Sequence, residues 1–300
     1  MTWRIVHIKE SEQLHLRLDN LEIYKQGAKY LIPLSDISMI VLEGNTSVTT
    51  NLLARFTKHN IVLVICDQKY LPTGLFLNYG NYHRSAKRSI QQMAWTQEQK
   101  QYIWEKIVGQ KILNQIAFAK FKQVDQERII NMEELYQQLE PGDTTNREGH
   151  VAKVYFNSLY GFEFTRDDEN LANGAMDYGY AIVRAAVARM VVGQGLMTMI
   201  GVFHKNEYNS FNLVDDLMEP FRPLMDYWID QKIFSNYEYL TYEARLTLID
   251  FLNQPMKYKS TISSVDQVMQ KYINSFVRAI SSEKETLHRV TLSDFMEAEK

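Results

Sequence analysis

Cysteine is nearly absent from this chain: Cys66, inside the apolar stretch "IVLVIC", is the only one among 300 residues. A single cysteine excludes a disulfide within the chain, and disulfide frameworks belong to oxidising compartments. Its apolar neighbours predict an inert thiol in a protein core. The opening "MTWRIVHIKE" does not resemble a secretory leader, so a cytoplasmic protein is expected.

A long uncharged apolar run is also missing. The most apolar stretch, residues 181–203, contains Arg184, Arg189 and Gln194. Polar and charged groups at that depth are costly in lipid. The stretch therefore predicts a buried helix rather than a membrane span, and no membrane partner is expected.

Positive charge is not in excess, since 33 Lys and Arg stand against 36 Asp and Glu and give a formal net charge of −3. Proteins that bind nucleic acids need cations to meet the phosphates. The overall charge argues mildly against such a protein, but it leaves local basic patches open.

Several catalytic signatures are absent from the sequence, namely HExxH, paired CxxC, GxSxG and GxxxxGK. Each of these motifs places the side chains or backbone amides that a particular chemistry requires. Zinc proteases, zinc ribbons, α/β-hydrolases and P-loop NTPases therefore have no support.

What is present begins with a change of pattern near residue 80. Before it, short segments of β-branched and aromatic residues predict strands and hairpins, with one amphipathic helix starting near Ser47. From about residue 85, apolar residues recur at helical spacing. We therefore expect an α+β fold, with a β-rich N-terminal domain containing one helix (1–77), a hinge (78–88) and an all-α C-terminal domain (89–300).

The stretch "TTNREGHVAKVYFNSLYG" contains the first candidate for chemistry. Thr145 and Glu148 have the spacing of a capping box, in which the Glu148 side chain would bond back to the Thr145 amide. In the alternative interpretation, the Glu148 carboxylate projects from the first helical turn into a cleft.

Further candidates lie in "HKNEYNSFNLVDDLMEPFRP". Asp216 and Glu219 share a face if this stretch is helical, and Asp215 points elsewhere. Taken singly, His204 could be an ordinary half-buried histidine and the acids could only complement a helix dipole. Together, an imidazole and carboxylates from separate segments suit a divalent ion. The residues alone thus indicate a metal-dependent enzyme acting on a phosphate-containing substrate, with the structural interpretation still open.

Four stretches in this order resemble a known family: "NREGHVAKVYFNSLYG", "NLANGAMDYGYAIVRAAVARMVVGQGL", "IGVFHK" and "VDDLMEPFRPLMD". They are similar to the CRISPR-associated integrases, the catalytic subunits of spacer-acquisition complexes. The resemblance covers nearly the whole chain. The N-terminal and "HKNEYNSF" stretches are most similar to the branch from systems with a single large effector nuclease.

The resemblance implies that Glu148, His204 and Glu219 are the metal ligands and catalytic residues, with Asp216 as a supporting acid. It also implies Mg²⁺ or Mn²⁺ as cofactor. The implied reaction is attack by the 3′-hydroxyl of a DNA fragment on a phosphodiester of the CRISPR repeat, or endonuclease activity when water replaces the hydroxyl. The implied partners are double-stranded DNA, a second copy in a homodimer formed largely through the β-rich domains, and a small ferredoxin-like subunit.

Two other functions stay open beside this one: a non-catalytic DNA-binding scaffold of the same fold, and a metallohydrolase of small phosphoesters. For DNA contacts, the sequence offers basic residues near the hinge and near the expected ligands: Arg84, Lys87, Arg88, Lys205 and Arg222. A basic linker is equally often just a solvated surface, so these contacts are a hypothesis.

Overall fold

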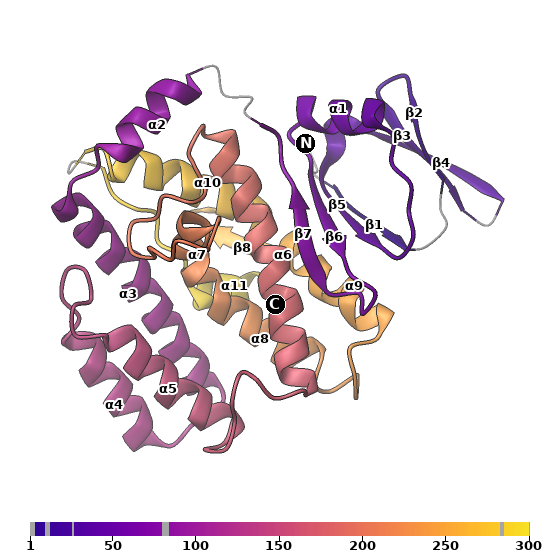
Figure 1. Cartoon of the computed structure of the whole chain (residues 1–300). Coiled ribbons are helices and arrows are strands. Elements are labelled where there is room, and N and C mark those ends of the chain that lie inside the picture. Colours follow the sequence, from indigo (N-terminus) through magenta and orange to yellow (C-terminus); the bar gives the residue numbers. More distant parts are fainter. Residues whose placement is uncertain (1–3, 10–12, 26, 80–83, 283–284, 300) are drawn as a thin grey trace.

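The computed structural model describes residues 4–9, 13–25, 27–79, 84–282 and 285–299. Its β-rich part, containing β1 to β7, lies beside a larger helical part (Figure 1). The expected order of a β-rich N-terminal region followed by a helical region is therefore confirmed. The chain reaches the first long helices only after β7, so all of the candidate ligands belong to the helical part.

The β-rich part contains two sheets. A mixed sheet has the order β1-β5-β6-β7, with parallel pairs β1–β5 and β5–β6, and an antiparallel meander has the order β2-β3-β4. The parallel pairs were not anticipated from the hairpin-like sequence pattern. The strands are β1 Arg4–Lys9, β2 Gln13–Arg17, β3 Asn20–Lys25, β4 Ala28–Pro33, β5 Ile37–Glu43, β6 Val62–Cys66 and β7 Pro72–Phe76.

The mixed sheet has a different core on each face, because alternate residues of a strand point to opposite sides. Met39 and Val41 of β5 belong to the core of the helical part, whereas Ile40 packs with the meander and with α1 (Thr50–Lys58). The expected helix starts slightly later than Ser47, at Thr50, and the Thr49 hydroxyl caps it.

The strand β6 is buried at its first three residues and partly exposed at its last two, so Cys66 lies at the edge of the core rather than inside it. Ile65 is 46% exposed. Cys66 is half-buried, and burial is the main cause that raises the pKa of its thiol to about 12. The thiol is therefore protonated and unreactive near neutral pH, as predicted.

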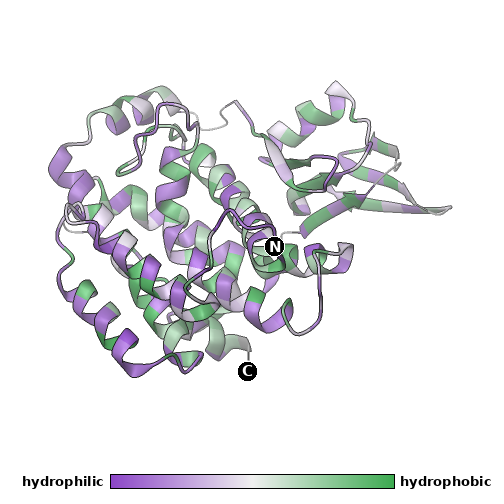
Figure 2. Ribbon diagram, turned by 60° about the horizontal axis from the view of Figure 1, so that its bottom comes forward, coloured by the Kyte–Doolittle hydropathy of each residue, from purple (hydrophilic) through white to green (hydrophobic). Residues whose placement is uncertain are grey.

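The helical part surrounds α6, which lies at its centre beside the mixed sheet (Figure 1). Residues 181–193 of the apolar stretch form the second half of this buried helix, whereas residues 194–203 follow it as turns and loop, so the expected helix ends earlier than the stretch does. Gly195, whose φ is +72°, takes the left-handed conformation just after the helix. Most helices alternate between polar and apolar residues along their length (Figure 2). The helices are α2 Ser85–Met93, α3 Gln97–Phe121, α4 Gln126–Gln137, α5 Arg147–Tyr160, α6 Leu171–Gly193, α7 Asn212–Met218, α8 Arg222–Lys232, α9 Tyr242–Asp250, α10 Val265–Ala279 and α11 Leu292–Glu299.

The helical part also contains a short hairpin that the sequence did not predict. Strands β8 (Pro255–Tyr258) and β9 (Thr261–Ser264) pair in antiparallel fashion. Four-residue strands carry too little periodicity to be recognised. Within the described residues, no helix is both long and apolar enough to cross a membrane.

The expected hinge, 78–88, overlaps α2, which already begins at Ser85, and its residues 80–83 lie outside the described ranges. The helix α2 is held by Gln92. This buried side chain donates hydrogen bonds to the carbonyl oxygens of Met197 and Ile200, and its own oxygen accepts one from the Met197 amide. The basic residues of α2 are thereby attached to the segment that leads to His204.

A buried ion pair joins the two parts of the molecule. The Arg245 guanidinium on α9 donates to both carboxylate oxygens of Glu43 at the end of β5, at 2.8 and 3.0 Å. Tyr178 of α6 donates a further hydrogen bond to Glu43. Burial opposes ionisation here, but His7 and Arg245 lower the pKa of Glu43 to about 2.

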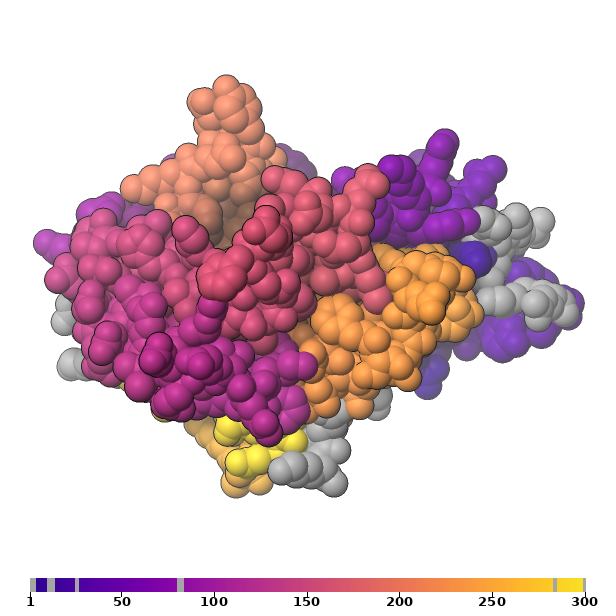
Figure 3. Space-filling model, turned by 90° about the horizontal axis from the view of Figure 1, so that it is seen from below, coloured from indigo at the N-terminus to yellow at the C-terminus, as the bar shows by residue number. Residues whose placement is uncertain are grey.

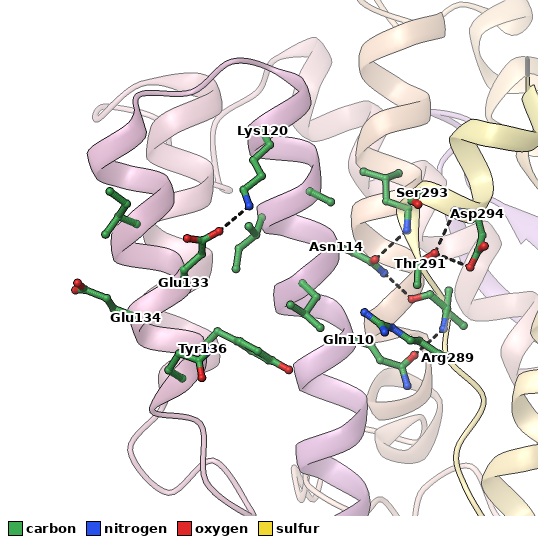
Figure 4. A pocket seen from close by; sticks show the side chains of 17 residues that line it. Gln110, Asn114, Lys120, Glu133, Glu134, Tyr136, Arg289, Thr291, Ser293 and Asp294 are labelled. Atoms are coloured by element: carbon green, nitrogen blue, oxygen red, sulfur yellow. Dashed lines mark hydrogen bonds and ion pairs between the residues drawn. The ribbon is translucent and has the colours of Figure 1, made fainter.

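The C-terminal segment is attached to α3 beside a cavity of about 840 Å³ (Figure 4). The Asn114 side chain accepts a hydrogen bond from the Leu292 amide and donates to the Val290 and Pro220 carbonyl oxygens. Gln110 accepts from the Val290 amide. The cavity lies between α4, α3 and the segment that enters α11.

Candidate active site

Glu148 lies in the first turn of α5, and of the two interpretations the capping box of Thr145 and Glu148 is not the one that the structure shows. The cap is Asp143, whose two carboxylate oxygens accept hydrogen bonds from the backbone amides of Arg147, at 2.7 Å, and Glu148, at 3.0 Å. Asn146 adopts the left-handed conformation at the helix start and provides no side-chain cap. Since Asp143 satisfies the helix end, the half-buried Glu148 carboxylate is left to reach another partner.

That partner is Lys111 on α3, a residue that the sequence analysis did not single out. Its ammonium donates a hydrogen bond to Oε1 of Glu148 and forms an ion pair with Oε2 of Glu219. The Lys111 side chain is 10% exposed and the Glu219 side chain 6%. Two of the three expected ligands, from α5 and from the 3₁₀ turn Glu219–Phe221, thus meet around one cation.

Glu219 has a second cationic neighbour. Arg222 donates from Nε to Oε1 of Glu219 at 2.9 Å. Burial opposes ionisation of this carboxyl, but Arg222 and Lys111 lower its pKa to about 2. The other oxygen, Oε2, is buried and receives no well-directed hydrogen bond, so nearby positive charge, with the Lys111 ammonium in direct contact, compensates it.

Asp216 fixes the position of His204. Its fully buried carboxylate accepts hydrogen bonds from the amides of Val202, Phe203 and His204, and it bonds to Nδ1 of the His204 ring at 2.7 Å. If Nδ1 carries the proton, Nε2 keeps its lone pair for a metal ion. This hydrogen bond is the main cause that raises the pKa of His204.

The backbone around this histidine requires a glycine. A Cβ atom on Gly201 would lie 2.6 Å from the His204 carbonyl oxygen and 2.7 Å from Oδ2 of Asp216. A side chain at this position would therefore displace the very groups that hold the imidazole.

Asp215 points away from this cluster, as predicted. It accepts two hydrogen bonds from the Arg184 guanidinium, at 2.7 and 2.5 Å, and one from Asn209. These contacts hold the segment that precedes α7. Seen from below, that segment stands out from the neighbouring surface (Figure 3).

A small polar cavity of about 240 Å³ adjoins the carboxylates, lined among others by Lys111, Glu219, Arg222 and Asp226. The Asp226 carboxylate accepts hydrogen bonds from the hydroxyls of Tyr155 and Tyr180. Burial is the main cause that raises the pKa of Asp226 to about 6. A carboxyl group with a raised pKa thus lines the same cavity as Glu219.

The expected DNA-binding residues are dispersed. Arg84 and Lys87 are exposed at the start of α2, and Arg88 is half-buried there. Lys205 is exposed next to His204. Arg222 differs from the others, because it is largely buried against Glu219 and its guanidinium lies over the Tyr180 ring.

The expected ligands are not all gathered at one point. Within the described ranges, no three His, Cys, Asp or Glu side chains lie close enough together to hold a metal ion. Glu148 and Glu219 share a cation, and His204 is near enough for the Glu219 charge to contribute to its raised pKa. The residues nevertheless suit a divalent ion. Carboxylate oxygens and one imidazole nitrogen are donor types that such an ion accepts, and here the two carboxylates already share a cation.

Comparison with known proteins gives one consistent result. The sequence profile described as "CRISPR associated protein Cas1" matches residues 6–241. The CRISPR-associated endonuclease Cas1 of Neisseria meningitidis is 36% identical over 283 residues, which cover 91% of each chain.

Two solved structures share the fold. A casposase bound to its integration product has a TM-score of 0.77 at 18% identity, covering 97% of this chain and 95% of the other. A chain of a Cas6-RT-Cas1–Cas2 complex has a TM-score of 0.73 at 18% identity, covering 98% of this chain and 36% of the other.

Proposed function

The chain belongs to the CRISPR-associated Cas1 family, and we propose that it is a metal-dependent DNA endonuclease and integrase. In this reaction, the 3′-hydroxyl of a short DNA fragment attacks a phosphodiester of the CRISPR repeat, and the fragment becomes a new spacer. Its relative from Neisseria meningitidis is an endonuclease of this family, and the resemblance in sequence extends over nearly the whole of both chains.

The observation that best supports a catalytic role is the meeting of Glu148 and Glu219 around one buried cation. Glu219 is nearly buried and Glu148 is half-buried, so the cation between them offsets a charge repulsion that a bound divalent ion would also offset. The same carboxylates match the expected metal ligands, and His204 is held for a third bond by Asp216.

We assign the metal-binding role to Glu148, His204 and Glu219. The bound Mg²⁺ or Mn²⁺ would supply charge that stabilises the phosphodiester oxygens as the bond to phosphorus is exchanged. Asp216 keeps the His204 ring in one tautomer and orientation. Arg222 keeps Glu219 ionised, and its guanidinium, stacked on Tyr180, borders the small polar cavity where a strand could approach.

The DNA path is proposed to include α2. Gln92 attaches this helix to the segment before His204, so Arg84, Lys87 and Arg88 lie on an element connected to the site. Lys205 would add a contact next to His204. These cations offset the net charge of −3 locally, where phosphates would lie.

We further propose that the chain acts as a homodimer through its β-rich domain (1–77), joined by the hinge 78–88 to the catalytic domain (89–300). A small ferredoxin-like subunit would hold double-stranded DNA between two such dimers. The similarity in fold to a chain of a Cas6-RT-Cas1–Cas2 complex is consistent with a Cas partner.

One experiment tests the function. The protein and its small partner are incubated with a labelled DNA fragment and a supercoiled plasmid carrying the repeat, with Mg²⁺, Mn²⁺, Zn²⁺ or chelator. We expect joined strands with Mg²⁺ or Mn²⁺ but not with Zn²⁺ or chelator, because the expected ligands include no thiolate. Binding without joining under every condition would favour the scaffold, and turnover of a chromogenic phosphoester without DNA joining would favour the small-molecule hydrolase.

A further inference from the structure

Lys111 occupies an unusual place for a lysine. It lies near the middle of α3, the fraction of its surface that is exposed is 8%, and its ammonium is directed at carboxylates on two other elements. Burial would lower its pKa, but Glu219 and Glu148 raise it. The ammonium therefore stays charged, and it is the cation that makes the approach of Glu148 and Glu219 possible.

The atoms that Lys111 contacts are the ones a metal ion would need. The ammonium contacts Oε1 of Glu148 and Oε2 of Glu219. Carboxylate ligands bind Mg²⁺ through oxygen lone pairs at about 2.0–2.1 Å, so an ammonium on the same oxygens competes with the ion. Two positive groups cannot share these oxygens without repulsion.

The structure also offers Lys111 another place. The cavity of about 240 Å³ is lined by Lys111 itself, Gln115 and Asp226, and also by the cations Arg166 and Arg222. Asp226 already accepts hydrogen bonds from two tyrosine hydroxyls, and it would gain an ammonium as a neighbour. The flexible lysine side chain could turn into this cavity without moving the backbone of α3.

We propose that Lys111 competes with the metal ion for the two carboxylates. Without metal, its ammonium holds Glu148 and Glu219 in position. When the ion binds, the ammonium moves away from their oxygens and into the adjacent cavity. This inference rests on the proposed metal site. Lys111 is then a positioning residue that stabilises the two carboxylates without metal and sets a threshold for metal occupancy.

The test measures Mn²⁺ binding by calorimetry and thermal unfolding with and without Mn²⁺, using the full chain. Lys111→Met removes the competing charge, and Lys106→Met, on the exposed side of the same helix, is the matched control. A unit positive charge a few ångströms from a divalent ion opposes the binding of that ion. We expect Lys111→Met to bind Mn²⁺ at least about tenfold more tightly than the native chain, and Lys106→Met to be unchanged.

The unfolding temperature supplies the second readout. Lys111→Met should unfold at a lower temperature without metal, because its carboxylates repel each other, and Mn²⁺ should raise that temperature more than it does for the native chain. A merely structural lysine would give the first effect but not the tighter binding. If Lys111→Met does not fold, Lys111→Gln, which keeps a polar side chain without the charge, is measured in its place.

The outcomes separate the two proposals. If Glu148→Gln and Glu219→Gln leave Mn²⁺ binding unchanged, the proposed metal site is wrong. If those substitutions weaken binding but Lys111→Met binds Mn²⁺ as tightly as the native chain, or more weakly, only the role assigned to Lys111 is overturned.

Discussion

The carboxylate of Asp216 bonds to Nδ1 of His204 at 2.7 Å and also accepts the backbone amide of the same residue. It thereby fixes both the ring and the chain that carries the ring. An asparagine in its place would present an amide nitrogen as readily as an oxygen, and would favour the wrong histidine tautomer.

We therefore expect Asp216→Asn to lower the rate of strand joining by about 10–100-fold, the usual effect of losing such a partner of a metal-bound histidine. Rates at saturating Mn²⁺ provide the measurement, and circular dichroism checks the fold. Glu207→Gln, on the exposed segment after His204, is the control and should retain activity. Native rates in Asp216→Asn would show that His204 needs no orientation.

Glu148 and Glu219 should both be essential for strand joining, but they differ in their structural cost. Glu219 is buried against Lys111 and Arg222, so Glu219→Ala would leave two buried cations without their shared partner and cost about 3–5 kcal/mol of stability. The half-buried Glu148 should tolerate alanine better.

The informative variants are therefore Glu148→Gln and Glu219→Gln, with His204→Ala beside them. Each should abolish joining while the chain stays folded and elutes at the native size. Full integration by a folded Glu219→Gln protein would remove this residue from the catalytic set.

Stability should depend on pH through Asp226. Its pKa is raised to about 6 in the folded chain from an ordinary value of 3.8, so the folded state holds a proton that the unfolded state has released. The contribution of Asp226 to folding is therefore most favourable below about pH 4, falls as pH rises to about 6, and is level above that.

At about 1.4 kcal/mol per pKa unit, the loss is roughly 3 kcal/mol. Denaturant unfolding of the native chain and Asp226→Asn across pH 4–7 measures it, since the asparagine cannot titrate. The difference in unfolding free energy between the two should grow in favour of asparagine as pH rises. A difference that stays constant would mean that Asp226 titrates normally.

The Glu43–Arg245 pair should control the attachment of the β-rich part to the helices. Both side chains are almost fully buried, so Arg245→Met leaves a buried carboxylate without its bidentate partner. We expect a loss of about 3–5 kcal/mol in unfolding free energy, with most of it recovered in the double variant Glu43→Met/Arg245→Met. Equal losses in the single and double variants would indicate that packing, not charge, is responsible.

DNA affinity should fall with salt at a slope of about −0.9 per neutralised phosphate. Reversing Arg84, Lys87 and Arg88 to glutamate should flatten this slope and weaken binding to all sequences alike, since phosphate contacts carry no base information. Lys257→Glu, on the β8–β9 hairpin, should leave the slope unchanged. If the triple variant keeps the native slope, the DNA path does not follow α2.

Periodicity in the sequence predicts much of the fold, but the sequence predicts the site only in part. The strands and helices follow spacing, and the separation of Asp215 from Asp216 follows helix geometry. The role of Asp143 as the cap of α5 was missed because Thr145 offers the commoner pattern. Lys111 gives no signal in the sequence: one lysine in a long helix looks like any other, and only the folded chain brings α3 against the 3₁₀ turn that carries Glu219.

The Asn114 side chain has a consequence for synthesis of the protein. It binds the Pro220 carbonyl, one residue from Glu219, and also the Val290 carbonyl and Leu292 amide, close to the C-terminus. These contacts join residues that are 106 to 178 positions apart along the chain. Residues up to Leu292 must therefore be synthesised before Asn114 can hold all three groups. The turn that carries Glu219 thus shares its anchor with the segment that enters α11, so a change in that segment can reach the site through Asn114.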